Sequence, residues 1–362
     1  MKKLVFTVTN DLSYDQRMIR ICTSLANAGY DVLLVGRRMR DSIPLPTRVY
    51  QQKRLLNLFP KGKAFYIEYN LHLFFLLLFT KADLICAIDL DTILPCYFAS
   101  KIKGSKRVYD AHELFCEMKE VVTRPRIYRA WKKIEKFSVP KFKWGYAVNH
   151  LIRDEFKNLY QRNFDVIRSL PFLKPLQVPG KKEKYILYQG AVNEGRSFET
   201  LIPAFKSVNA KLIIAGDGNF LSQAKQLVKE NQLEQKIIFI GKIEPEKLFE
   251  LTTGAWVGLT LFENKGLSNY YSLANRFFDY IQAAVPQLCV GFPAYAELNQ
   301  QYDIAVLIND LSSENICKEL NKMLEDEELY NRLQKNCLKA REVLNWQQEE
   351  KKLISYYQSI FG

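Results

Sequence analysis

A glycine-containing loop near the middle of the chain has the composition of a phosphate-binding turn. Gly190 ends a strand-like run, and Gly195 and Arg196 follow where a helical pattern begins. Glycine lets backbone amides approach an anion, and the start of a helix carries partial positive charge. Arg196 could add a two-pronged hydrogen bond to a diphosphate. An ordinary strand-to-helix turn with a surface arginine explains the same residues, and this loop alone favours that simpler interpretation.

A polar loop at residues 266–274 leads into a second helical pattern. Backbone amides at a helix start lack partners within the helix and can bind an anion. Here these amides belong to Ser272, Leu273, Ala274 and Asn275. Asp279, early in the helix, could accept hydrogen bonds from ribose hydroxyls. Spacing alone favours the simpler alternative for Asp279, a solvated carboxylate on a helix face.

Residues that bind metals or form disulfides are few and scattered. The seven cysteines are odd in number and never in C-x-x-C spacing, which argues against a disulfide framework or zinc site and predicts a reducing, cytoplasmic environment. We expect neither an H-E-x-x-H nor a D-x-D pair to supply a metal site, so protein cations and helix dipoles would stabilise a departing anion. His72 lies in an apolar run and is expected to be at least partly buried.

Strand-like runs alternate with helical periodicity along the whole chain, which predicts two α/β domains with parallel sheets. In residues 1–170 we expect strands at 4–8, 31–35, 84–88, 107–109 and 145–148. Residues 169–182 carry three prolines and one glycine and are expected to connect the domains. In residues 171–345 we expect strands at 185–189, 211–215, 237–240, 256–261, 287–290 and 305–308. Residues 346–362 form a terminal helix that should pack back on the first domain.

Positive charge is concentrated in the first domain. Residues 1–170 contain 30 Lys and Arg against 16 Asp and Glu, whereas the remaining residues contain 22 against 23. Between Lys101 and Lys143 the basic residues are interleaved with Trp131, Phe137 and Phe142, and Trp144 follows directly. This composition predicts an anionic partner such as a membrane surface, and a basic surface that serves only solubility explains it equally well. We expect no nucleic acid, because helix-turn-helix and zinc-finger spacing are absent.

Motifs in both domains resemble glycosyltransferase family 4, which comprises GT-B glycosyltransferases described as glycosyl transferases group 1. In the second domain the matching segments are residues 190–197, 216–218, 239–241 and 271–286, in the order and at the separations of the family. In the first domain residues 15–17, 89–92 and 108–113 also look like the family. The resemblance covers almost the whole chain.

The resemblance implies two Rossmann-like domains facing across a cleft, with the terminal helix crossing back to the first domain. It implies a retaining transfer of a hexose from a UDP- or GDP-sugar to an acceptor hydroxyl on a glycan or lipid-linked acceptor, in polysaccharide or glycolipid assembly. No metal or other cofactor is implied. The location would be cytoplasmic, peripheral at the inner membrane face.

The resemblance also assigns roles to residues. Arg196 takes the place of the family's diphosphate-binding lysine, and Asp279 that of its ribose-binding glutamate. Leu273 and Ala274 would offer amides to the phosphates, and Gly241 and Lys242 would lie near the base. The catalytic residues would be His112, standing over the transferred sugar, and Glu113 beside it.

The sequence departs from the family at two donor-binding positions. Ala191 stands where the family has an arginine, and Tyr271 where it has the first glutamate of its E-x7-E motif. Either Lys242 or Arg276 could replace the missing cation. Two alternatives therefore stay open, a nucleotide-sugar epimerase of the same architecture and a weakly active or non-catalytic sugar-binding relative.

Overall fold

The computed structural model describes residues 1–13, 15–40, 42–176 and 184–362. The chain divides into two compact units. The first unit comprises Met1–Ser169 and Glu349–Gly362, and the second comprises Leu170–Gln348. The segment expected to connect two domains begins at this division, and its residues 177–182 lie outside the described part of the chain.

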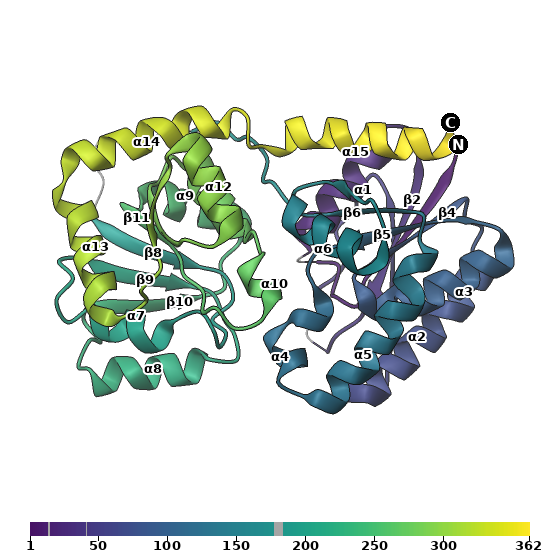
Figure 1. The fold of residues 1–362 in the computed structure, drawn as a ribbon, viewed down its shortest axis with the longest axis horizontal. Helices are drawn as coiled ribbons and strands as arrows, with labels where there is room; N and C mark the ends of the chain where they lie inside the picture. Colours follow the sequence, from purple (N-terminus) through teal and green to yellow (C-terminus); the bar gives the residue numbers. More distant parts are fainter. Residues whose placement is uncertain (14, 41, 177–183) are drawn as a thin grey trace. The chain divides into compact units, whose positions relative to one another are not determined.

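The first unit is built on a parallel sheet of seven strands (Figure 1). The strands follow the order β3-β2-β1-β4-β5-β6-β7 across the sheet. The central strand β4 is buried along its whole length, because helices cover both faces of a parallel sheet. The bounds are β1 Lys3–Thr7, β2 Asp31–Arg37, β3 Gln51–Leu55, β4 Leu84–Ile88, β5 Lys106–Ala111, β6 Trp144–Ala147 and β7 Asp165–Val166.

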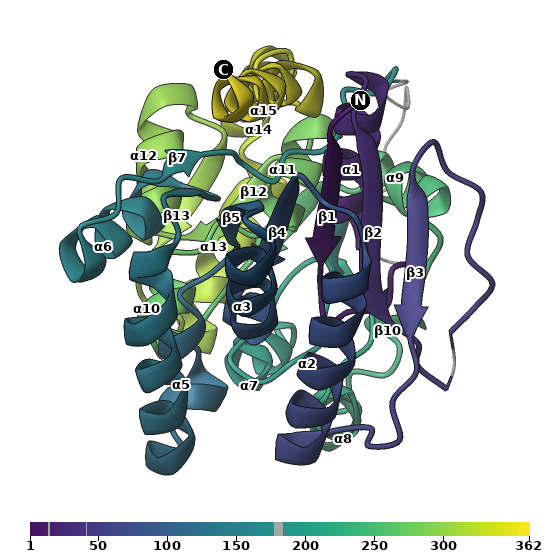
Figure 2. The same ribbon diagram turned by 90° about the vertical axis from the view of Figure 1, so that its right-hand side faces the viewer.

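Helices connect these strands and cover the sheet. Figure 2 shows three of them, α2, α3 and α5, side by side on one face. The bounds of the helices before the second unit are α1 Gln16–Asn27, α2 Gly62–Phe79, α3 Ile93–Lys103, α4 Lys119–Val122, α5 Pro125–Ser138 and α6 His150–Tyr160.

The terminal helix α15, Trp346–Phe361, contributes most of its length to the first unit. Tyr357 is fully buried, and its ring lies 5.9 Å from that of Phe6 in β1. The Glu349 carboxylate accepts a hydrogen bond from the Arg168 amide at 2.8 Å. The apolar stripe of this helix, together with a buried carboxylate, therefore holds it against the first sheet.

The second unit has a parallel sheet of six strands in the order β10-β9-β8-β11-β12-β13. Its core consists of a large cluster of buried aliphatic and aromatic side chains and a smaller, separate cluster that includes Leu187 and Tyr280. The strands are β8 Tyr185–Gln189, β9 Lys211–Ala215, β10 Ile237–Gly241, β11 Val257–Thr260, β12 Gln287–Val290 and β13 Ala305–Ile308. The helices are α7 Phe198–Ala204, α8 Leu221–Glu230, α9 Pro245–Gly254, α10 Leu267–Tyr270, α11 Asn275–Gln282, α12 Pro293–Tyr302, α13 Ser313–Glu325 and α14 Glu327–Arg341.

The two α/β sheets confirm the predicted fold class, and three details differ from the sequence expectation. The edge strands β3 and β7 were not expected, because β3 has the polar sequence QQKRL and β7 is only two residues long. The expectation that His72 is buried is wrong. Its side chain is exposed on α2, because the helix turns Leu73 and not His72 toward the sheet.

Candidate functional site

The second sheet has a natural ligand-binding edge. Its strand order reverses between β8 and β11, so the chain leaves the carboxyl ends of these neighbouring strands toward opposite sides. Ligands of open parallel sheets bind at this point, where the diverging loops leave a crevice. Gly190 follows β8 directly, and Phe262 lies just beyond β11. Several of the predicted donor-binding residues therefore belong to this edge.

The loops after β8 and β9 meet backbone to backbone. Gly190 and Gly216 have φ angles of +117° and +155°, which favour glycine. A Cβ on Gly216 would lie 1.8 Å from the Gly190 carbonyl oxygen. The Gly190 amide donates to the Ala215 carbonyl at 2.9 Å. The glycine turn after β9 thus has a structural role, since it fixes the path of the loop that carries Gly190.

Two arginines lie on the ring of Phe262. The Arg196 guanidinium carbon is 4.3 Å from the ring centroid, and that of Arg276 is 5.0 Å from it. Arg276 also lies 4.5 Å from the ring of Tyr188 in β8. Cation–π contacts of this kind hold a guanidinium in place without neutralising its charge. The structure therefore brings Arg196 together with a second cation that the sequence offered only as one of two substitutes.

Of the two candidate substitutes, Arg276 and not Lys242 lies beside Gly190. A Cβ on Gly190 would be 3.8 Å from the Arg276 guanidinium carbon. Arg276 is 8% exposed, and its Nη1 has no hydrogen-bond partner among the described residues. Lys242 has a side chain that is 76% exposed and lies 3.7 Å from the Asp217 carboxylate. A buried guanidinium N–H without a partner is costly, so this geometry favours an anionic ligand.

Asp279 lies at the same edge. The side-chain amide nitrogen of Gln189 donates to the Asp279 carboxylate at 3.1 Å, and the Thr252 hydroxyl donates to the side-chain amide oxygen of Gln189 at 2.7 Å. This chain of hydrogen bonds fixes the carboxylate near the end of β8. Its binding of ribose stays a prediction.

At the start of α11, two of the four predicted amides already have partners. The Ala274 amide donates to the Tyr295 hydroxyl at 2.9 Å, and the Ser272 amide donates to the Asn269 carbonyl at 3.1 Å. In this structure the Ala274 amide is thus engaged by Tyr295, and its contact with phosphate stays a prediction. The sequence could not show it, because Tyr295 comes from α12. Leu273 and Asn275 remain the predicted amide donors.

The first unit carries a second polar cluster, at the carboxyl ends of β4 and β5. His112 follows β5, and its two ring nitrogens lie 3.3 Å from the Asp110 carboxylate and 3.4 Å from that of Asp89. Asp110 is fully buried and pairs with the Arg17 guanidinium of α1 at 2.9 Å. The segments 15–17, 89–92 and 108–113, which the sequence linked only through the family resemblance, are thus joined in one network of charged side chains.

The network sets the charge of His112. Burial by itself would lower the pKa of the His112 ring. The carboxylates of Asp110 and Asp89 together outweigh this effect and raise the pKa above its usual value, to about 9. For the Asp110 carboxyl, burial by itself would raise the pKa. The charges of Arg17 and His112 outweigh this and bring the Asp110 pKa below its usual value. Burial raises the pKa of Asp89 to about 8, with His112 opposing and Glu113 adding to the rise. At neutral pH the ring of His112 is therefore protonated.

Asp89 is held in an unusual backbone conformation. Its φ of 55° and ψ of −178° belong to a region that is almost exclusive to glycine. Such a conformation costs about 1–3 kcal/mol and persists only where the surroundings impose it. Here the Asp89 amide donates to the Asp110 carbonyl, and the Asp89 carboxylate accepts the His112 amide, each at 2.9 Å. Strain of this kind is typical of functional sites.

The D-x-D spacing of Asp89 and Asp91 does not make a metal site here. The Asp89 carboxylate faces His112, whereas the Asp91 carboxylate accepts the Thr9 hydroxyl at 2.5 Å. Within the described ranges, no three His, Cys, Asp or Glu side chains are grouped so that they could hold a metal ion. Metal independence stays a prediction.

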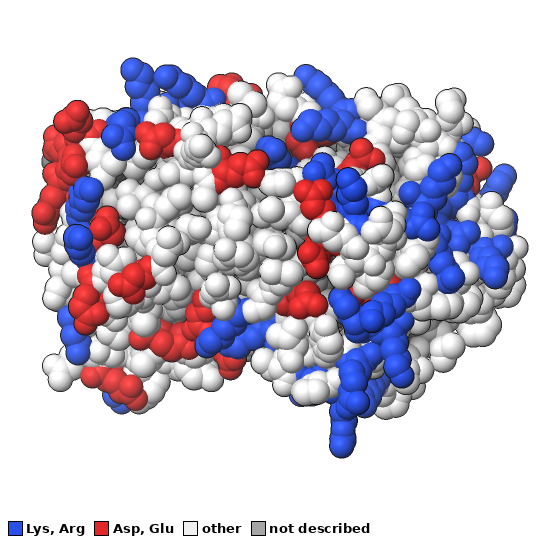
Figure 3. All heavy atoms as spheres, in the orientation of Figure 1, with Lys and Arg blue, Asp and Glu red and all other residues white. Residues whose placement is uncertain are grey.

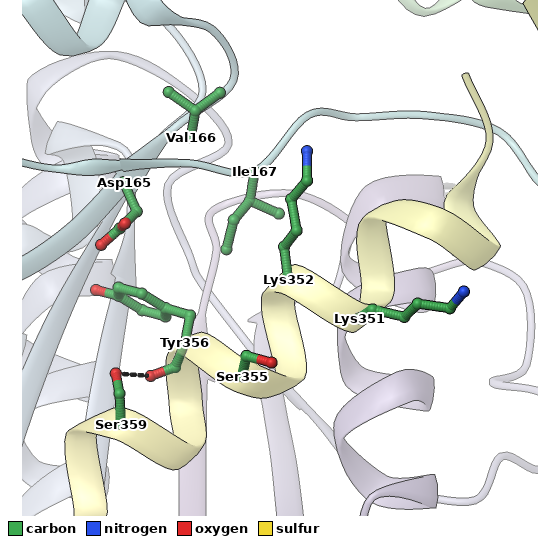
Figure 4. A pocket seen from close by; sticks show the side chains of 8 residues that line it. All are labelled: Asp165, Val166, Ile167, Lys351, Lys352, Ser355, Tyr356 and Ser359. Atoms are coloured by element: carbon green, nitrogen blue, oxygen red, sulfur yellow. Dashed lines mark hydrogen bonds between the residues drawn. The ribbon is translucent and has the colours of Figure 1, made fainter. Parts of the chain in front are cut away.

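A separate surface pocket of about 530 Å³ lies between β7 and α15 (Figure 4). The residues that line it are Asp165, Val166, Ile167, Lys351, Lys352, Ser355, Tyr356 and Ser359. None of the predicted catalytic or donor-binding residues is among them. The pocket therefore does not belong to either polar cluster.

Comparison with protein families matches the second unit of the chain. Residues 173–340 match the family model described as glycosyl transferases group 1. The N-acetyl-alpha-D-glucosaminyl L-malate synthase of Bacillus anthracis is 23% identical over 232 residues, 59% of this chain and 58% of that protein. The alpha-monoglucosyldiacylglycerol synthase of Streptococcus pneumoniae is 25% identical over 150 residues, 40% of this chain and 31% of that protein. The chain thus spans less than two thirds of either curated relative.

Solved structures match along the whole chain. Sucrose-phosphate synthase from Thermosynechococcus elongatus has a TM-score of 0.82 at 14% identity and covers 100% of this chain and 99% of its own. Anabaena HepE in complex with UDP and glucose has a TM-score of 0.78 at 13% identity, and the match covers 99% of this chain and 100% of HepE. At these identities the likeness shows the fold, which is GT-B.

Proposed function

We propose that this chain is a group 1 glycosyltransferase that transfers a hexose from a nucleoside diphosphate sugar to an acceptor hydroxyl, with retention of anomeric configuration; the match of its second unit to the family model and its GT-B fold support the proposal. The observation that carries the proposal is the pair of cations on Phe262. Arg196 and Arg276 lie on one aromatic ring at the ligand-binding edge of the second sheet. A diphosphate is the ligand whose charge suits two guanidinium groups.

We propose a UDP-sugar as the donor. One structural neighbour, Anabaena HepE, has been solved in complex with UDP and in complex with UDP-glucose. The acceptor that we propose is a glycan or a lipid-linked glycan, since one curated relative is named as a synthase of a glucosylated diacylglycerol.

In the proposed reaction the bond between the anomeric carbon and the β-phosphate oxygen breaks. The acceptor oxygen forms the new bond on the same face of the sugar, and its proton passes to the departing phosphate oxygen. The leaving group gains negative charge as the bond breaks, and Arg196 and Arg276 stabilise that charge. This role for protein cations makes a metal ion unnecessary for the step.

The role proposed for His112 rests on how its ring is held. Both ring nitrogens face carboxylates, so the ring itself is fixed in orientation. We assign the contact with the transferred sugar to the His112 backbone carbonyl, with Asp89 and Asp110 as positioning residues. Glu113 follows directly in the chain and raises the Asp89 pKa through its charge. His112→Ala should lower kcat and leave the Kd for UDP unchanged.

The test is a transfer assay with a panel of UDP- and GDP-sugars and glycan acceptors, in the presence and absence of EDTA. We expect UDP release that depends on the acceptor, resists EDTA, and gives a product with the donor's anomeric configuration by NMR. An inverted product would refute retention, and loss of turnover in EDTA would refute metal independence. Turnover of the UDP-sugar to its epimer without acceptor would instead identify an epimerase.

A further inference from the structure

Helices α2, α3 and α5 form one layer on the first sheet (Figure 2). Several of their apolar side chains are exposed. We call this surface the α2–α3–α5 face. Its exposed apolar residues are Ile67, Leu71, Phe75 and Phe79 of α2, Phe98 and Ile102 of α3, and Phe137 of α5. None of the predicted catalytic or donor-binding residues belongs to it. The residues proposed to bind the donor and carry out the transfer therefore do not account for this surface.

Helix α2 has two apolar stripes, and only one is covered. Its buried residues, Phe65, Tyr69, Leu73 and Leu77, recur every four positions and pack toward the sheet. Offset by two positions, an exposed stripe runs along the helix at the same spacing, and it ends at Phe79, which is 87% exposed. A helix at the surface of a globular protein normally places polar residues on that side. The second stripe therefore indicates an apolar partner.

The neighbouring helices continue the apolar surface. The rings of Phe98 in α3 and Phe137 in α5 lie 6.2 Å apart, and Tyr97 meets Phe137 edge to face at 5.7 Å. On the α2 side, Lys103 of α3 donates to the Leu77 carbonyl at 3.0 Å, which ties the ends of the two helices together. The apolar residues therefore belong to one packed layer and not to separate exposed spots.

Cations border the apolar residues. The exposed basic residues of α5 are Arg126, Arg129, Lys133 and Lys136, spaced so that they follow one side of the helix. The three helices contain eight Lys and Arg but only two Glu, and Glu135 is buried against Lys132. Figure 3 shows Lys and Arg side chains gathered over the first unit. The face is therefore apolar and positively charged together.

We propose that the α2–α3–α5 face docks on an anionic lipid bilayer, with the exposed stripe of α2 entering the headgroup region and the cations of α5 contacting lipid phosphates. Exposed apolar residues flanked by Lys and Arg are the pattern of helices that lie in a membrane interface. Each Lys or Arg near an anionic leaflet strengthens binding about fivefold, as about 1 kcal/mol per residue implies. No helix in the described part of the chain is long and apolar enough to cross a membrane.

A second copy of the chain suits this face less well. A symmetric dimer places the same patch of both copies in contact, so the basic stripes of two α5 helices would meet. Like charges brought together in an interface oppose association. An anionic bilayer, in contrast, satisfies the apolar and the charged residues at once. The inference rests on the proposed function in one respect only, because a lipid-linked acceptor is presented at a bilayer.

The test is flotation of the full chain with phosphatidylcholine vesicles that contain either no phosphatidylglycerol or about one third of it. We expect binding only to the anionic vesicles, weakening as salt is raised. The variant Arg129→Glu/Lys133→Glu should lower partition at least about 25-fold, since two attractive charges are lost. The matched control is Lys335→Glu/Lys339→Glu on α14, two exposed lysines at the same spacing, which should bind like the wild type.

A second variant tests the apolar contribution. Leu71→Gln/Phe75→Gln should also weaken binding, whereas Leu338→Gln/Val343→Gln on the second unit should not. Equal effects of the α5 and α14 charge reversals would overturn the proposal, as would equal binding to neutral and anionic vesicles. Undiminished binding of Leu71→Gln/Phe75→Gln would identify a site for polyanions instead of a bilayer surface. Self-association without lipid that this variant abolishes would identify a dimer interface.

Calorimetry with UDP separates this proposal from the proposed function. Every variant of the α2–α3–α5 face should bind UDP as the wild type does, because none of its residues lies in the second unit. Normal UDP binding with no vesicle binding would refute the docking surface alone. Normal vesicle binding with no UDP binding would refute the donor site alone.

Discussion

Replacing Arg276 with methionine removes the cation that the structure places beside Gly190. A charge-assisted hydrogen bond to phosphate contributes about 1.5–3 kcal/mol. Its loss should weaken the Kd for UDP about 10- to 150-fold. Uridine, which has no phosphate, should bind the variant as it binds the wild type. Isothermal titration with the two ligands therefore isolates the phosphate contribution.

The same substitution should have little effect on the stability of the ligand-free protein. Arg276 has a buried nitrogen without a partner among the described residues, and replacing a buried charge by an apolar side chain of similar volume is often neutral or stabilising. The cation–π contacts with Tyr188 and Phe262 oppose this by about 1 kcal/mol. Urea denaturation should therefore show a change of about 1 kcal/mol or less.

The exposed Lys242 provides the matched control. Lys242→Met removes a cation that directly follows β10, an edge strand of the same sheet. We expect less than a threefold change in the Kd for UDP. A larger loss of UDP affinity in Lys242→Met than in Arg276→Met would show that Lys242, and not Arg276, replaces the phosphate-binding cation that is missing at Ala191. Equal losses of uridine and UDP affinity in Arg276→Met would show a packing role and refute the assignment to the diphosphate.

Three further predictions concern the two sites. Arg17→Met leaves the fully buried Asp110 carboxylate with His112 as its remaining charged partner and should lower the unfolding free energy by about 1–3 kcal/mol in urea, whereas Arg17→Met with Asp110→Leu should recover most of it. Gly216→Ala should reduce UDP binding at least tenfold by calorimetry, because its Cβ would meet a carbonyl oxygen at 1.8 Å; unchanged binding would show that the loop yields. Stability should fall as pH rises from about 6.5 to 9, since the folded state holds a proton on His112, whose pKa is raised to about 9. The His112 contribution, up to about 3 kcal/mol, is fully present below pH 6.5, and its part of the slope should disappear in His112→Gln.

The sequence by itself determined the α/β class and most of the strands. The predicted strands at 185–189, 211–215, 287–290 and 305–308 match β8, β9, β12 and β13 residue for residue. Central strands of a parallel sheet are covered on both faces, so they read as short apolar runs. The edge strands β3 and β7 of the first sheet lack this signal, since an edge position relaxes the requirement for apolar residues, whereas β13 at an edge of the second sheet keeps an apolar sequence.

The sequence also predicted which loops carry the proposed donor-site residues, through the glycines and cation around Gly190 and Arg196 and through the family resemblance. It left the substitute cation undecided between Lys242 and Arg276. Only the packing of Arg276 against Tyr188 and Phe262 decided it, because these three residues come from α11, β8 and the loop after β11. Likewise, the Ala274 amide is taken by a hydroxyl 21 positions further along the chain.

Only the tertiary structure decided the charge state of His112 and the second apolar stripe of α2. Arg17 and Asp110 are 93 positions apart, and their pairing depends on the order in which the strands enter the sheet. Periodicity shows that a helix is apolar on two sides but not which side the sheet covers. Local spacing specifies an element and its chemistry, whereas partners, burial and pKa depend on contacts between distant segments.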